Sequence, residues 1–97
     1  MSGYFSEEQR EALVAVLLER PEVARALFVP DGPKPMLAFE YDERPASVAE
    51  AQTRVHELLA AVAPALGDTA REIGFSAGGP EEIALYAAGA ELVYERP

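Results

Sequence analysis

The fold is decided by the stretch Val23-Ala-Arg-Ala-Leu-Phe-Val29, Pro30-Asp-Gly-Pro-Lys-Pro35 and Met36-Leu-Ala-Phe-Glu-Tyr41. The first run is mostly apolar, which is typical of a strand that is covered on most of both faces. The middle run is dense in residues that fix or permit turn dihedrals. In the last run Leu37, Phe39 and Tyr41 share one face, and the residues between them share the other. We therefore predict a hairpin with strands at 23–29 and 36–41.

A helix is predicted before this hairpin. Ser6 and Gln9 form a Ser-x-x-Gln capping box, which marks the start of a helix. Glu7 and Glu8 follow in the first turn, where the helix dipole favours acidic residues. Pro21 ends the helix, and its apolar face carries Leu13, Val16 and Leu17.

The longest helix is predicted after the hairpin. Ser47 and Glu50 form a second capping box, and Glu50 stands four residues before Arg54, a favourable spacing for a surface ion pair. Gly67 is expected just after the helix, and Pro64 predicts an end or a kink near Val62. The expected core stripe is Val48, Ala51, Val55, Leu58, Leu59, Val62 and Leu66.

The rest of the chain predicts a third strand at 71–76, with Ile73 and Phe75 on one face, and a short third helix. Gly78-Gly79 breaks the strand, and Pro80 suits the first helical position. The expected buried face of this helix carries Ile83, Tyr86, Ala87 and Ala90. Leu92-Val93-Tyr94 reads either as a last strand or as an apolar tail docked on the sheet.

Together these elements predict one α+β domain over residues 1–97. Their order is α-β-β-α-β-α, followed by a last strand if residues 92–94 form one. The expected architecture is a two-layer sandwich. Its sheet has three or four strands in a mixed arrangement that contains the antiparallel hairpin.

Composition narrows the classes of function. The net charge is −9, and the eight basic residues are spread along the chain, which argues against binding to nucleic acid or to anionic membranes. No apolar run approaches the roughly 20 residues of a membrane span, and the N-terminus lacks the pattern of a signal peptide, so we expect a cytoplasmic protein. Arginine supplies seven of the eight basic residues, and asparagine and cysteine are absent, as in GC-rich bacteria and some heat-adapted organisms.

Residues that could do chemistry are sparse. His56 has no cysteine or second histidine with which to share a metal, and we interpret it as a surface or boundary residue. Glu81 and Glu82 follow Gly78-Gly79-Pro80 and would repel a phosphate at that helix start. Asp31 is interpreted as a turn residue, and the paired carboxylates as helix-start or solvated groups. The sequence therefore predicts no catalytic, cofactor-binding or metal-binding residue, and a protein that is not an enzyme.

Several short runs resemble one family. They are Glu19-Arg-Pro-Glu-Val23 with Ala24-Arg-Ala-Leu-Phe-Val-Pro30, Pro35-Met-Leu-Ala-Phe-Glu40, Gly74-Phe-Ser76 and Leu92-Val-Tyr-Glu-Arg96. In this order they are similar to the C-terminal domain of the bacterial SseB family (enhanced serine sensitivity protein). The resemblance implies a small α+β domain without established catalytic residues. Family members often have a preceding domain, so it also implies a stand-alone version here.

The function expected from these observations is a non-catalytic protein-binding or self-assembly module, with a homodimer or another protein as partner. A homodimer would form through a sheet edge or through the tail, and Leu92, Val93 and Tyr94 are the interface candidates. The alternative is a small-molecule sensor with a pocket between the sheet and the long helix.

Overall fold

The structure is a computed structural model that describes residues 5–30, 34–86 and 88–97. Its elements follow the predicted order and include one extra 3-10 helix, η1. They are α1 (Glu7–Leu18), β1 (Val23–Val29), β2 (Met36–Tyr41), α2 (Val48–Leu66), η1 (Gly67–Arg71), β3 (Gly74–Gly78), α3 (Pro80–Ala84) and β4 (Glu91–Glu95). The bounds of β1 and β2 are those predicted. The turn between them, with Asp31, lies outside the described residues.

The sheet has four strands in the order β3-β2-β1-β4. β1 is antiparallel to both β2 and β4, whereas β2 and β3 are parallel and are connected through α2. The predicted mixed sheet of an α+β fold is therefore confirmed. Of the two alternatives for the end of the chain, the last strand is the one that forms.

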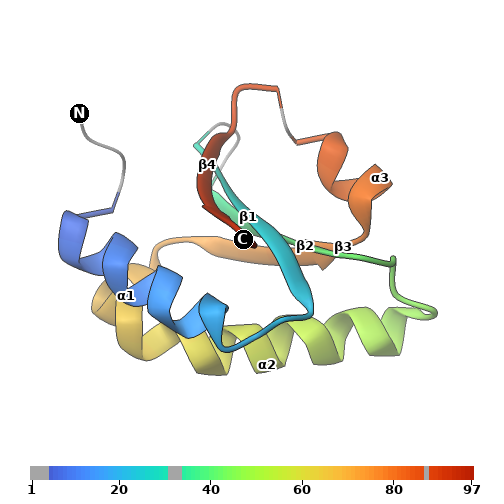
Figure 1. The fold of residues 1–97 in the computed structure, drawn as a ribbon, viewed down its shortest axis with the longest axis horizontal. Coiled ribbons are helices and arrows are strands. Elements are labelled where there is room, and N and C mark those ends of the chain that lie inside the picture. Colours follow the sequence, from blue (N-terminus) through green and yellow to red (C-terminus); the bar gives the residue numbers. More distant parts are fainter. Residues whose placement is uncertain (1–4, 31–33, 87) are drawn as a thin grey trace.

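Helices cover the two faces of the sheet unequally. Figure 1 shows α1 and α2 side by side beneath one face and the short α3 on the opposite side. The main core lies between the sheet and the two longer helices, and Leu13, Leu58 and Phe39 are fully buried in it. A smaller cluster under α3 joins Ile83 to Leu27 and Ala38. Among the described residues, no helix combines the length and the apolar character needed to cross a membrane.

The helix ends follow the predicted caps with two differences. The capping box of Ser6 and Gln9 is complete. At α2, Ser47 Oγ accepts a hydrogen bond from the backbone N–H of Glu50, but the Glu50 carboxylate accepts from the N–H of Ala46, so the second box is only half formed. α2 also continues past Pro64 to Leu66, because Leu66 packs into the core, and it ends at Gly67 with φ of 61°.

Three further predictions need correction. Val48 is 75% exposed and lies outside the core. The third strand is Gly74–Gly78 and not 71–76, because the 3-10 helix includes Arg71. The third helix ends at Ala84, so the continuous buried face expected beyond Ile83 does not form. Tyr86 is exposed, and Ala87 lies outside the described residues.

Candidate interaction site at the edge of strand β3

β3 is an edge strand, and its outer side is the first half of the candidate site. It pairs with β2, and the part of the chain that the structure describes places no strand on its other side. The N–H of Gly74 donates to the carbonyl of Pro35 at 2.8 Å, so Gly74, and by alternation Ser76 and Gly78, turn their backbone polar groups toward β2. Phe75 and Ala77 therefore turn theirs outward. Such groups are a template for a further strand.

The second half of the site is one side of α2. A groove of about 460 Å³ runs between the first half of this helix and β3. The helix contributes Val48, Ala51, Gln52, Val55 and His56, and the strand contributes Phe75, Ser76 and Ala77. Because Val48, Gln52 and His56 are exposed, the groove is open to solvent.

The groove is uncharged in a strongly acidic protein. The described residues that line it include no carboxylate, lysine or arginine, and His56 is the one titratable side chain among them. Helical spacing explains this separation, since Glu50, Arg54 and Glu57 recur three and four residues apart on another side of α2. The sequence thus keeps the charges of this helix away from β3.

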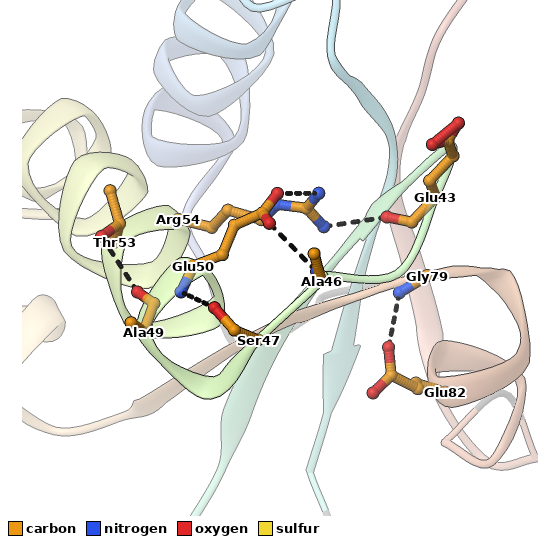
Figure 2. A network of polar contacts seen from close by, with 9 residues as sticks. All are labelled: Glu43, Ala46, Ser47, Ala49, Glu50, Thr53, Arg54, Gly79 and Glu82. Atoms are coloured by element: carbon orange, nitrogen blue, oxygen red, sulfur yellow. Dashed lines mark hydrogen bonds and ion pairs between the residues drawn. The ribbon is translucent and has the colours of Figure 1, made fainter.

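A polar network fixes the start of α2 and thereby the position of Val48. Figure 2 shows its members at the junction of β2 and α2. Arg54 donates to Glu50 Oε1 at 3.0 Å and to the carbonyl of Glu43 at 2.8 Å, and Ser47 Oγ caps the helix. The link 42–47 is therefore held against the first turns of α2, and Val48 follows at its end.

Tyr41 contacts the same junction through the Arg54 side chain. The Arg54 guanidinium lies 4.3 Å from the centre of the Tyr41 ring, in a cation–π contact. Burial raises the pKa of the Tyr41 hydroxyl, and the negative charge of Glu22 acts in the same direction. The neutral ring thus anchors Arg54, which in turn holds the link.

Beyond Val48 the groove leads to a region that carries one charge of each sign. A neighbouring hollow shares Val48 and Ala51 with the groove and reaches Arg44 and Glu82. Glu82 Oε1 accepts a hydrogen bond from the N–H of Gly79 at 2.9 Å, as Figure 2 shows. Gly79 must be glycine here, because a Cβ atom would lie 2.5 Å from the backbone nitrogen of Arg44.

The three interface candidates predicted from the sequence differ in their exposure to solvent. Val93 and Tyr94 are only 8% and 6% exposed and belong to the core. β4 pairs with β1, and an irregular register between Ala26 and Leu27 interrupts the usual alternation of side chains at this point. Leu92 is 48% exposed and lies opposite Leu27 of β1. Only Leu92 of the three therefore presents a large side chain to solvent.

The remaining candidates stay apart from one another. His56 is exposed on α2, and within the described ranges no three His, Asp or Glu residues are placed to hold a metal ion. Glu40, which the sequence did not single out, is nearly buried, but its carboxylate pairs with Arg25 Nη2 at 2.6 Å. Glu40 and Arg25 are cross-strand neighbours, so their pairing is structural.

Comparisons with protein-family models, with curated proteins and with solved structures find no match. The candidate site therefore rests on the geometry of this chain alone.

Sequence reasoning missed this site for a definable reason. The apolar stripe that includes Val48 and Val55 predicts core positions along its whole length, although Val48 in the first turn is exposed and Val55 is only partly buried. The parallel pairing that makes β3 an edge strand depends on tertiary structure. One usable signal was present, namely the lack of charge on the side of α2 that carries Val48, Gln52, Val55 and His56.

Proposed function

We propose that this chain is a non-catalytic, cytoplasmic protein-binding module whose contact site is the β3 edge with the adjoining α2 groove. The observation that carries the proposal is that a free strand edge lies beside an open, uncharged groove. The likeness to the SseB C-terminal domain belongs to the same proposal, since it implies a domain without catalytic residues.

The mode of binding follows from the two halves of the site. An extended segment of a partner adds a strand to β3, and the outward N–H and C=O groups of Phe75 and Ala77 supply its main-chain hydrogen bonds. Alternate side chains of that segment enter the groove over Val48 and Val55. Burial of their apolar surface contributes about 25 cal/mol per Å² before the entropy cost of association.

The alternative function, metabolite sensing, would use the same hollow between the sheet and α2. Sites for small ligands bury most of the ligand surface. The exposed Val48, Gln52 and His56 leave this groove open along α2, which suits a flat partner segment better.

The proposal is tested with peptides of defined origin. A library of random ten-residue peptides is selected on the wild-type chain at submicromolar concentration, and the enriched peptides are measured by fluorescence polarisation. We expect them to bind the wild type but to lose at least about tenfold in affinity for Val48→Glu. Leu85→Glu is the matched control, because Leu85 is 83% exposed and does not line the groove.

Two results would reject a binding site at this edge. One is a selection that enriches no peptide on the wild-type chain. The other is a set of peptides whose affinity falls as much with Leu85→Glu as with Val48→Glu.

A further inference from the structure

We infer that the natural occupant of the β3 edge is a second copy of this chain, paired antiparallel strand to strand about a two-fold axis at Ser76. This inference rests on the proposed function and names its partner. It joins two four-stranded sheets into one sheet of eight strands and brings the two α2 grooves together.

The hydrogen-bonding pattern of β3 fits this symmetry. With Ser76 opposite Ser76 of the second copy, Phe75 lies opposite Ala77 of that copy, and the converse pair forms by symmetry. Phe75 and Ala77 are the residues whose backbone groups turn outward. All their outward N–H and C=O groups are then paired in four hydrogen bonds across the interface.

The side chains of β3 are self-complementary in the same register. Phe75 and Ala77 both point to the face covered by α2, where Phe75 stacks on Phe39 with ring centres 6.3 Å apart. Each large Phe75 therefore meets a small Ala77 of the other copy. On the opposite face the two Ser76 residues and Gly74 are small and leave space for close approach, whereas the space over Gly78 is filled by the Glu82 side chain of the same chain.

Charge favours a second copy at this edge, although each chain carries −9. Residues 74–78 and the residues that line the groove carry no carboxylate, so two acidic molecules can meet here without placing like charges in contact. The other sheet edge, β4, begins at Glu91 and ends at Glu95. Antiparallel pairing of two β4 strands would set Glu95 of one copy opposite Glu91 of the other, and although Glu91 is paired with Arg10, this is less favourable than the uncharged β3 edge.

Charge also favours the antiparallel direction. Arg71 and Glu72 precede β3 and cancel in charge, whereas Glu81 and Glu82 follow it and are both negative. A parallel arrangement would place the two acidic ends side by side. The antiparallel arrangement places the acidic end of one copy beside the neutral end of the other.

The test is light scattering after size exclusion, with a concentration series of the wild-type chain and four variants. The contact involves one five-residue strand from each copy, so we expect a weak dimer with a dissociation constant in the micromolar range. Val48→Glu is expected to raise it at least tenfold, because two carboxylates enter the contact. The variant should still fold, since Val48 is exposed in the first helical turn, where an acidic side chain is favourable.

Ala77→Pro tests the strand pairing separately, because it removes an outward N–H while leaving the bonds to β2 in place. Leu85→Glu and Leu92→Glu are the controls, and neither should change the dissociation constant more than about twofold. Circular dichroism confirms that each variant is folded.

The outcomes distinguish two levels of the proposal: that the β3 edge is a binding site, and that its occupant is a second copy of this chain. A wild-type chain that is monomeric up to about 500 micromolar overturns the second copy, while peptides that bind wild type and not Val48→Glu would still support the binding edge. A dimer that persists in Val48→Glu and Ala77→Pro, or that is broken by Leu92→Glu, places the interface elsewhere and overturns the inference. A dimer lost in Val48→Glu and Ala77→Pro and kept in both controls supports both levels.

Discussion

Arg96 shows how a single exposed side chain holds the end of the chain in place. Its guanidinium donates to the carbonyl of Pro21 at 2.8 Å and to both carboxylate oxygens of Asp42, and its N–H donates to the carbonyl of Ala24. These contacts tie the residue after β4 to the turn before β1 and to the end of β2. The hydrogen bond from Arg96 lowers the pKa of the Asp42 carboxyl below its ordinary range.

A pH dependence follows from that lowered pKa. The folded state prefers the ionised Asp42, so its contribution to stability is full above the ordinary carboxyl range and is lost as the pH falls through the lowered pKa. Asp42→Asn should therefore reduce the free energy of unfolding at pH 6, and the difference from wild type should be smaller at the lowest pH at which the chain stays folded. Because both side chains are exposed, the effect is small and decreases with salt. Urea unfolding at the two pH values measures it.

The result that would contradict this account is a difference between Asp42→Asn and wild type that is the same at both pH values. Glu95→Gln provides the matched control, since it also removes one carboxylate near the end of β4, and no hydrogen bond of its side chain is described. It measures the effect of removing one carboxylate from this part of the surface without removing the contact to Arg96.

At the residue scale, sequence reasoning succeeded where local chemistry decides the outcome. Ser6 and Ser47 cap the starts of their helices and Gly67 follows the last residue of α2, as predicted. Such caps depend on residues only a few positions away. His56 is exposed, in agreement with its interpretation as a surface or boundary residue. Val48 was placed wrongly, because helical spacing gives the direction of a side chain around the axis but not the point at which the sheet beneath it ends.

Among the elements, α1 and α2 are joined by one side chain that does two tasks. Gln9 completes the capping box by accepting a hydrogen bond from the N–H of Ser6. Its amide nitrogen also donates to the carbonyl of Leu66 and to Thr69 Oγ1, each at 3.0 Å. The start of α1 is thereby fixed to the end of α2. The sequence predicted the box, but these long-range contacts require the folded chain.

This double role predicts an order of effects. Ser6→Ala removes one cap and should cost about 1 kcal/mol in the free energy of unfolding. Gln9→Ala removes the return hydrogen bond and leaves two partly buried acceptors without their donor, so it should cost about 1 kcal/mol more than Ser6→Ala. Chemical denaturation of both single variants and the double variant measures this. Equal costs for the two single variants would show that the contacts to Leu66 and Thr69 contribute nothing.

The elements also differ in how well the sequence defined them. β1 and β2 were predicted with their observed bounds, because apolar runs bounded by turn residues are a strong local signal. β3 and α3 have only five residues each. Gly74 and Gly78 stand at the two ends of β3 and Pro80 at the start of α3, so the apolar pattern is too short to place their limits correctly. The 3-10 helix that displaces the start of β3 has no sequence pattern of comparable strength.

For the whole molecule, the two edges of one sheet have opposite properties. The β4 edge carries Glu91 and Glu95, and Glu91 forms an ion pair with Arg10 of α1. Charged residues on an edge strand discourage further pairing. The β3 edge lacks such residues and has a groove beside it. The sheet is thus protected on one edge and open on the other, as expected of a module that associates in one direction only.

Salt dependence tests whether the uncharged β3 edge holds the two copies together. Two chains of charge −9 repel each other over the Debye length, which is about 30 Å at 0.01 M salt and about 8 Å at 0.15 M. The contact itself is uncharged, so added salt screens the repulsion without weakening the contact. The dissociation constant of the dimer should therefore fall severalfold between about 0.02 and 0.3 M sodium chloride. Sedimentation equilibrium measures it. A dissociation constant that rises with salt would mean that attraction between opposite charges holds the copies together, which the uncharged β3 edge does not provide.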